Sequence, residues 1–213
     1  MTNIYTQNIR LITDETITKW LTLLPTARRE QLEKYHFHDD LVRSLTGEAM
    51  VRITTSAKVG QAPWDLIIER AVPRQKAEGL KPFFPDCPDI HFNISHSGDW
   101  VVCAISDFEV GIDVEELYER RISPALIKRV LTVSEQAHWQ SLPEHEQVRA
   151  FYDLWTKKEA YVKCLGSGLT LDIGAIDINE VRYDGSDTSL FDIQNIDFTL
   201  GYTLAVCIKR AKC

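Results

Sequence analysis

The 213-residue sequence has no long uninterrupted hydrophobic stretch. Its longest clean apolar run is Trp100–Ile105, far shorter than the ~20 residues that a membrane-spanning helix needs. The first residues, MTNIYTQNIRL, also lack the charged and then apolar pattern of a secretory signal. We therefore expect a soluble protein of the cytoplasm that does not enter a membrane.

The sequence contains few cysteines, and their spacing is not that of a disulfide-bonded scaffold. Five cysteines occur, an odd number, and no two of them form a Cys-x-x-Cys pair. This pattern argues against a disulfide scaffold and against a zinc ribbon. Cys103 and Cys207 lie in apolar runs, where a thiol behaves as a small buried hydrophobe. A reducing compartment fits such cysteines best.

The sequence has fewer basic than acidic residues, with 24 Lys and Arg against 31 Asp and Glu, so the net charge is −7. A bulk attraction to nucleic acid or to an anionic membrane is not expected from that sign. An anionic ligand must instead meet a local group of basic side chains. Such groups occur at Arg28–Arg29, Arg43, Arg52, Arg120–Arg121 and Lys128–Arg129.

Two common catalytic loops are also absent. The chain has no Gly-x-x-x-x-Gly-Lys loop of a P-loop nucleotide hydrolase and no Gly-x-Ser-x-Gly elbow of a serine hydrolase. What is present is an ordinary globular composition, with 44% hydrophobic and 26% charged residues. No repeat and no low-complexity segment is visible. The length suits one domain or two small halves that share an interface.

The first half is predicted to be mainly helical after an initial strand. Apolar residues at four-residue steps between Leu41 and Ile53 give residues 39–56 the clearest helical face, and Arg52 falls on its polar side. Asp14 is a candidate N-cap of an earlier helix. The expected elements are a strand at 3–12, helices at 14–24, 26–35 and 39–56, and loops at 57–90 with a short strand at 66–68.

The second half is predicted to begin with strands and continue with helices, after a change of character near residue 110. Pro124 suits the first turn of a helix, Ser134 is a candidate N-cap, and Gly166 is a plausible helix end. The expected elements are a hairpin at 91–96 and 100–105 with its turn at 97–99, a strand at 110–114, helices from 123 to 165, and further strands in 169–213 with a turn at Asp184-Gly185.

Two acids follow each other at a spacing of two in Gly111-Ile112-Asp113-Val114-Glu115. On a strand, Asp113 and Glu115 project together on one face while Ile112 and Val114 point into the core. Adjacent carboxylates repel each other unless a cation lies between them, and Mg²⁺ prefers such oxygens. A solvated strand face with two acids is the alternative.

A helical segment, Trp155-Thr156-Lys157-Lys158-Glu159-Ala160-Tyr161-Val162-Lys163, places Trp155, Glu159 and Lys163 on one face. A lysine near a carboxylate suits a phosphoryl-transfer site. The alternative is an ordinary Glu-to-Lys surface pair, which contributes ~0.2–0.5 kcal/mol.

Small hydroxyls and an imidazole gather at the end of the predicted hairpin, in Ser95-His96-Ser97-Gly98. Backbone amides of such a turn, together with Ser and His donors, can hold a phosphate oxygen. Equally, these polar residues can cap their own turn.

Together these three segments make the chain resemble the Sfp-type 4′-phosphopantetheinyl transferases. The family's three signatures occur here in order along the chain, as Asn93–Gly98, then Gly111–Glu115, then Trp155-x-x-Lys158-Glu159-Ala160-x-x-Lys163. Lesser similarities are Lys81-Pro82, a Leu131-Thr132-Val133-Ser134-Glu135 element with Leu in place of Phe, and Gly166-x-Gly168-Leu169. The resemblance extends from about residue 20 to 207. Three ordered motifs joined by lesser matches are far more specific than one.

The resemblance implies an α+β fold of two similar half-domains related by a pseudo-twofold axis, with the active site in the cleft between them. The halves are expected at residues 1–110 and 111–213. The implied reaction moves 4′-phosphopantetheine from coenzyme A to a serine of an apo acyl or peptidyl carrier protein and releases adenosine 3′,5′-bisphosphate. A non-catalytic module that binds coenzyme A or a carrier is the alternative. The expected enzyme is a monomer without nucleic-acid partners.

The resemblance also assigns roles to individual residues. Mg²⁺, or alternatively Mn²⁺, would be held by Asp113, Glu115 and Glu159, and Glu159 is the candidate general base. His96 and Lys163 would donate to the pyrophosphate of coenzyme A, with Ser95 close to the same phosphates. The expected contacts to the adenosine and its 3′-phosphate are Lys81, Arg43 and Arg28, where Arg29 is the alternative to Arg28.

The carrier protein must dock on a local patch, because carriers that resemble known ones are acidic and this chain is acidic too. Leu126, Ile127 and Lys128, which follow the acidic strand closely in the sequence, are our expected part of that patch.

Overall fold

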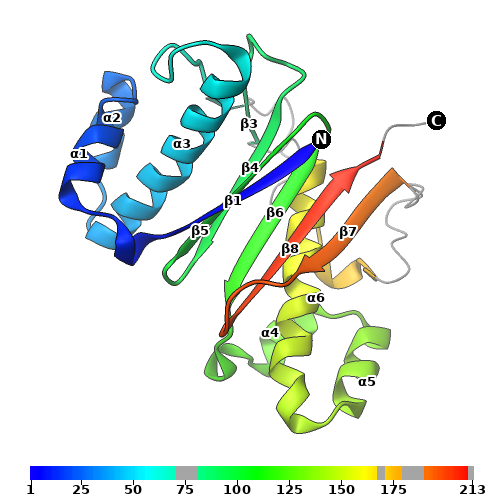
Figure 1. Ribbon diagram of the computed structural model, residues 1–213. Helices are drawn as coiled ribbons and strands as arrows, with labels where there is room; N and C mark the ends of the chain where they lie inside the picture. Colours follow the sequence, from blue (N-terminus) through cyan, green and yellow to red (C-terminus); the bar gives the residue numbers. More distant parts are fainter. Residues whose placement is uncertain (71–80, 167–170, 179–189, 211–213) are drawn as a thin grey trace.

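Two three-stranded antiparallel sheets form the centre of the computed structural model, which describes residues 1–70, 81–166, 171–178 and 190–210 (Figure 1). Their strand orders are β1-β5-β4 and β6-β8-β7. The strands are β1 (Thr2–Asn8), β4 (His91–Ser97), β5 (Trp100–Ser106), β6 (Val110–Glu116), β7 (Phe191–Ile196) and β8 (Tyr202–Lys209), besides a short ladder of β2 (Glu69–Arg70) and β3 (Pro82–Phe83).

Six α-helices accompany these sheets in the described part of the chain. The longest are α3 (His38–Val59) and α6 (Glu144–Leu165), and each ends at a glycine in the left-handed conformation. The others are α1 (Asp14–Leu21), α2 (Thr26–Leu32), α4 (Pro124–Val130) and α5 (Val133–Ser141), with short 3₁₀ turns at Ile9–Leu11, Glu119–Arg121 and Ile173–Ala175.

The same topology occurs twice along the chain. A first strand (β1 or β6) is followed by short helices, a 22-residue helix (α3 or α6) and two further strands. In both sheets the third strand lies between the first and the second. The expected α+β fold of two similar halves is therefore confirmed. The repeat is one of topology, which explains why no repeat is visible in the sequence.

Alternating side chains on β8 explain how the layers stack. Leu204 and Val206 pack toward the first sheet, together with Val102 of β5. Ala205 and Cys207 point the opposite way and pack on α6. On the far side of the first sheet, a cluster that includes residues of β4 and β5 packs on α3. The two sheets thus face each other, with one long helix outside each (Figure 1).

Strand β6 lies at the edge of its sheet, and side chains of β4 satisfy its outward N–H groups. The amides of Ile112, Val114 and Glu116 donate to Asn93 Oδ1 (3.0 Å), Ser95 Oγ (3.4 Å) and Ser97 Oγ (3.1 Å), respectively. Buried amides need such partners, and here three alternate side chains supply them. We call these contacts the β4–β6 seam. It joins the two halves and fixes the strand that contains the acid pair.

Several local predictions were wrong. No strand forms at 66–68; the short strand there is β2 at 69–70. Thr13 caps α1 in place of Asp14, and Thr132 caps α5 in a capping box with Glu135, which displaces Ser134. On α3, Arg52 is buried and Ile53 is exposed, the reverse of the expected faces. The predicted turn at Asp184-Gly185 and the motif residues Gly168 and Leu169 lie outside the described residues.

The hairpin, the strand at 110–114 and the helix that ends at Gly166 are confirmed. Cys103 and Cys207 are buried free thiols, as expected. Within the residues that the structure describes, no helix has the length and hydrophobicity to cross a membrane.

Candidate active site

Residues from three distant motifs meet in one hydrogen-bonded cluster. Lys163 on α6 donates to Asp113 Oδ1 on β6 at 2.6 Å and to Ser95 Oγ on β4 at 2.9 Å. Ser95 Oγ in turn donates to the same Asp113 oxygen at 2.8 Å. The alternative of a surface pair between Glu159 and Lys163 is not found among the described residues, because the lysine pairs with Asp113. The cluster therefore joins both halves of the protein.

The other two predicted acids lie within the electrostatic field of Asp113. Burial, and next the charge of Asp113, raises the pKa of Glu115 to about 7. The same two causes, in the same order, raise the pKa of Glu159. Ser97 opposes the rise at Glu115 by donating to its Oε2 at 2.9 Å. A nearby positive charge would stabilise the ionised form of three neighbouring carboxyl groups.

The acid trio is not a preformed metal site. Among the described residues, no group of three or more His, Cys, Asp and Glu side chains is arranged to hold a metal ion. The donors nevertheless fit a hard cation, because Asp113 Oδ2 is buried and has no hydrogen-bond partner in the described part of the chain. Asp113 Oδ1, by contrast, is occupied by Lys163 and Ser95.

A glycine brings the acidic strand close to its helix. A Cβ added at Gly111 would lie 2.0 Å from the carbonyl oxygen of Ala160 and 2.4 Å from the amide nitrogen of Cys164. Only a residue without a side chain allows β6 to lie this close to α6. The contact brings Asp113 within hydrogen-bonding distance of Lys163.

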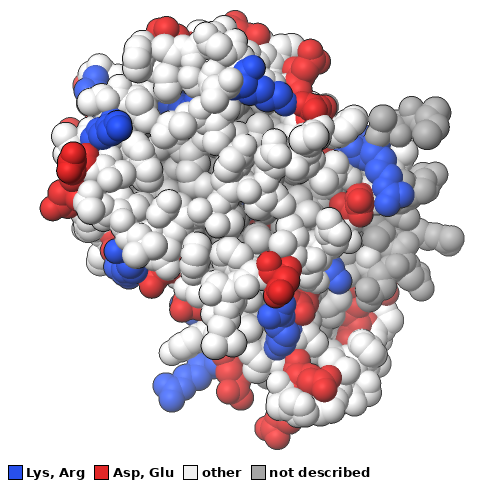
Figure 2. All heavy atoms as spheres, viewed as in Figure 1, with Lys and Arg blue, Asp and Glu red and all other residues white. Residues whose placement is uncertain are grey.

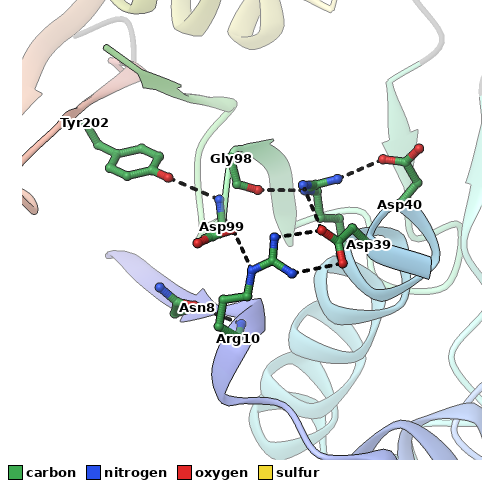
Figure 3. Close-up of polar contacts among 8 residues, drawn as sticks. Asn8, Arg10, Asp39, Asp40, Gly98, Asp99 and Tyr202 are labelled. Atoms are coloured by element: carbon green, nitrogen blue, oxygen red, sulfur yellow. Dashed lines mark hydrogen bonds and ion pairs between the residues drawn. The ribbon is translucent and has the colours of Figure 1, made fainter. Parts of the chain in front are cut away.

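The hairpin turn is held by protein groups from both halves, as Figure 3 shows. The amide of Asp99 donates to Tyr202 Oη at 3.1 Å, and Gly98 O accepts from Arg43 Nε at 2.8 Å. Arg10 joins the turn to α3 through Asp99 and Asp39. The Asp99 amide therefore already has a partner, and the hydroxyls of Ser95 and Ser97 donate to Asp113 and Glu115, so these three groups do not support the prediction that the turn holds a phosphate.

A cavity of about 330 Å³ opens beside this hairpin. Arg28, Arg43 and His96 line it, together with Ser44 and Glu48. His96 lines it from an exposed position of β4. Partial burial, and then the positive charges of Arg43 and Lys163, lower the pKa of the imidazole. Three of the residues that the resemblance assigns to coenzyme A therefore surround one space.

Arg28 and Arg29 differ clearly in their surroundings. The Arg28 guanidinium is half-buried and donates to Glu48 at 2.6 Å and to Ser44 at 3.0 Å. Arg29 is exposed, and its guanidinium donates to Thr26 of its own helix. Of these two candidates, Arg28 is the one that lines the cavity.

Lys81 lines a neighbouring cavity of about 350 Å³, which shares Pro82 and Phe92 with the first. Its Nζ donates to Glu109 Oε2 at 2.5 Å and lies 3.4 Å from the carbonyl oxygen of Cys164 at the end of α6. His91 also contacts Glu109, at 3.4 Å. Lys81 therefore belongs to the same side of the molecule as the other basic candidates, but it is one cavity further along.

Two features of the site were missed from the sequence. Lys158, the first lysine of the Lys-Glu-Ala motif, is fully buried and donates to Glu135 and to the carbonyl oxygen of Val130. Arg52 is also buried and pairs with Glu48. The capping pattern from Thr132 to Glu135, and the four-residue spacing from Glu48 to Arg52, were the available signals.

Charged side chains are dispersed over the face shown in Figure 2. Basic and acidic groups alternate there, and no broad basic surface forms on that face. The basic residues of the site are local and paired, which agrees with the net charge of −7.

Comparison with known proteins identifies the family. Residues 109–207 match the model of the 4′-phosphopantetheinyl transferase superfamily, and residues 12–107 match that of the 4′-phosphopantetheinyl transferase N-terminal region. The 4′-phosphopantetheinyl transferase Sfp of Bacillus subtilis is 31% identical over 205 residues, which cover 93% of this chain and 88% of the relative. The chain therefore belongs to the 4′-phosphopantetheinyl transferase superfamily and is an enzyme of that kind.

Other relatives agree. The 4′-phosphopantetheinyl transferase gsp of Aneurinibacillus migulanus is 35% identical over 185 residues, covering 84% of this chain and 74% of the relative. The mouse L-aminoadipate-semialdehyde dehydrogenase-phosphopantetheinyl transferase is 29% identical over 174 residues, covering 76% of this chain and 55% of the relative.

Proposed function

We propose that this transferase moves 4′-phosphopantetheine from coenzyme A to a serine hydroxyl of an apo acyl or peptidyl carrier protein. Adenosine 3′,5′-bisphosphate is the second product. The observation that supports this most is the convergence of Ser95, Asp113 and Lys163, one residue from each motif, in a single cluster. That cluster lies where the two halves meet, which we propose to divide at residue 110.

We assign the metal to the acid trio. Asp113, Glu115 and Glu159 would hold Mg²⁺, or alternatively Mn²⁺, and the unpartnered Asp113 Oδ2 supports this assignment. When bound, the ion would offset negative charge on the pyrophosphate of coenzyme A. The raised pKa values of Glu115 and Glu159 are consistent with acids that lack a cation.

The remaining groups bind coenzyme A and accept the proton of the carrier serine. Lys163 and His96 donate to phosphate oxygens, and Arg28, Arg43 and Lys81 contact the adenosine and its 3′-phosphate. Glu159 accepts the proton of the carrier serine, which is the general-base role of a carboxylate. Ser95 contributes mainly by orienting Asp113 and Lys163.

We further propose that the enzyme acts in the cytoplasm as a monomer, since one chain supplies both sides of the site and its described cysteines are free. The carrier docks partly on α4, where Lys128 is exposed and Leu126 and Ile127 pack partly against the core. Charge reversal at Lys128 should weaken carrier binding without changing the affinity for coenzyme A.

Intact-mass measurement of an apo carrier protein tests the reaction. After incubation with coenzyme A and Mg²⁺ the carrier should gain the mass of phosphopantetheine. Replacing the base, Glu159→Gln, should slow the gain by about 10²–10⁴-fold. Glu144→Gln, on an exposed position of the same helix, is the matched control and should leave the rate unchanged. No mass gain with any of several carriers would refute the proposed reaction, and a fully active Glu159→Gln variant would refute the assignment of the base.

A further inference from the structure

Glu48 on α3 shares its carboxylate between two arginines. Its Oε2 accepts from Arg28 Nε at 2.6 Å, and its Oε1 accepts from Arg52 Nε at 3.1 Å and Nη2 at 3.0 Å. The Glu48 side chain is 13% exposed. Each oxygen therefore serves a different guanidinium in a largely water-excluded place, where charge-assisted hydrogen bonds are strong.

The two arginines have different freedom. The Arg52 side chain is 3% exposed, and its Nη1 donates to the carbonyl oxygens of Pro63 at 2.9 Å and Leu66 at 2.8 Å. It therefore cannot turn toward a ligand. The Arg28 side chain is 26% exposed and comes from the separate helix α2. Arg52 is thus a fixed anchor, and Glu48 transmits its position to Arg28.

Arg28 reaches the cavity through this arrangement. Its Nη2 donates to Ser44 Oγ at 3.0 Å, and both residues line the same space as Arg43 and His96. The trio of Arg28, Glu48 and Arg52 has one net positive charge. Without Arg52, the carboxylate would cancel the charge of Arg28; with it, the cavity wall stays attractive to an anion.

We propose that Glu48 is a positioning residue for coenzyme A, which holds the Arg28 guanidinium in the orientation that binds the 3′-phosphate. This inference rests on the proposed function and extends it to a residue that contacts the ligand only through another. A purely structural role, in which Glu48 merely joins α2 to α3, is the competing explanation.

The variant Glu48→Gln distinguishes these roles. Its amide can still accept from Arg52, but its NH₂ group would face the N–H donors of Arg28 and turn that side chain away. Loss of the negative charge acts in the opposite direction; it is the smaller effect because Arg52 already compensates that charge at 3.0 Å. We therefore expect weaker binding of coenzyme A, by about tenfold or more.

The test compares coenzyme A with dephospho-coenzyme A, which lacks the 3′-phosphate, by calorimetric Kd and by KM and kcat for carrier modification. Glu48→Gln should raise Kd and KM for coenzyme A, leave kcat within about twofold, and leave the values for dephospho-coenzyme A nearly unchanged. Glu30→Gln, an exposed residue of α2 with the same charge change, is the control and should behave as wild type.

A double-mutant cycle completes the test. In an Arg28→Ala background, Glu48→Gln should have no further effect on the affinity for coenzyme A. An equal loss for both ligands, an unchanged affinity, a tightened affinity, or additive losses in the double variant would overturn the inference while the transferase function stands. A wild-type protein that neither binds coenzyme A nor modifies a carrier would overturn the proposed function and this inference with it.

Discussion

The two lysines of the Trp-x-x-Lys-Glu-Ala-x-x-Lys motif should give opposite results when they are replaced. Lys158 is fully buried, and its ammonium group donates to Glu135 and to the carbonyl oxygens of Val130 at 2.6 Å and Ile173 at 3.2 Å. Lys163 is half-buried and faces Asp113. We expect Lys158→Met to destabilise the fold and Lys163→Met to remove activity from a folded protein.

The expected loss of stability in Lys158→Met follows from the buried Glu135 carboxylate that the substitution leaves without its ion-pair partner. Without it, the buried carboxylate of Glu135 keeps only the amide donors of Thr132 at 2.8 Å and Ile178 at 3.2 Å. Removing one partner of a buried ion pair costs about 3–5 kcal/mol. For a chain of this length, each kcal/mol lowers Tm by about 2–4 °C, so the expected decrease is ~6–20 °C.

A second variant distinguishes the net contribution of the Lys158–Glu135 ion pair from the cost of removing only one of its partners. Burial lowers the pKa of Lys158, and the hydrogen bond and charge of Glu135 offset only part of that decrease. The intact ion pair therefore contributes little net stability to the fold. Lys158→Met with Glu135→Gln removes both charges and keeps an acceptor for the α5 cap. This double variant should recover at least half of the lost stability.

Calorimetric unfolding and carrier modification are measured on the same samples. Lys157→Met, at a half-buried position of the same helix, is the matched control for stability. A Lys158→Met variant with wild-type Tm, or a double variant less stable than the single one, would refute the reasoning. So would a Lys163→Met variant that retains full activity.

Three further predictions concern the framework. Gly111→Ala should cost about 3 kcal/mol or more in unfolding free energy, because its Cβ would lie 2.0 Å from Ala160 O; chemical denaturation measures this. Asn93→Ala should cost about 1–3 kcal/mol, since the buried amide of Ile112 loses its acceptor in the β4–β6 seam. Hydrogen bonding from its histidine partner, and then from its lysine partner, lowers the pKa of Glu109 to about 2 from an ordinary 4.5. Its stabilisation is therefore complete above pH 4.5 and is lost as the pH falls toward 2, so a Glu109→Gln variant should approach wild-type stability over that range in pH-dependent denaturation.

Strand periodicity was enough to orient the acid pair. The spacing of two in Ile112-Asp113-Val114-Glu115 separates core residues from acids, and Ile112 and Val114 do pack in the core between the sheets. The roles of the site residues rest on the resemblance, and the structure adds their contacts. No local pattern could show that Lys163 pairs with Asp113, because these residues lie 50 positions apart in the chain.

The β4–β6 seam could not be predicted from the sequence either. The hydroxyls of Ser95 and Ser97 suggested ligand donors, whereas these side chains, together with Asn93, accept hydrogen bonds from the open edge of β6. That role depends on β6 being an edge strand, which is a property of the whole sheet. The period of two nevertheless leaves His96 pointing away from the seam and toward the cavity.

The buried Lys158 did leave a trace in the sequence. Phe151 and Tyr161, seven residues before it and three after it, lie on the same helical face and are fully buried. A lysine on such a buried helical face needs a buried acid to compensate its charge. Glu135 in the capping box was the available candidate. Periodicity gives the face of a helix, but it cannot give the partner that compensates a charge there.

Each predicted phosphate-binding cation apart from His96 is already paired with an acid in the structure. At Lys163, Lys81 and Arg43, a bound phosphate would therefore replace a carboxylate as the partner of a cation that is oriented in advance. This exchange avoids the cost of holding an unpaired cation in a partly buried place. Arg28 differs, because on our proposal it keeps Glu48 while its remaining donors face the ligand. The pairs are Lys163–Asp113 (2.6 Å), Lys81–Glu109 (2.5 Å), Arg43–Asp40 (2.8 Å) and Arg28–Glu48 (2.6 Å).

The acids that such an exchange releases are not equivalent. Glu109 keeps His91, and the side chain of Asp40 is 46% exposed and can turn to water. Asp113 differs, because its side chain is 5% exposed and one of its oxygens has no partner within the described residues. If Lys163 turns to a phosphate, this buried carboxylate needs a new positive charge more than any other acid of the site. On our proposal, the need for a divalent cation would therefore be greatest at Asp113, and it would arise from the same exchange that binds the pyrophosphate.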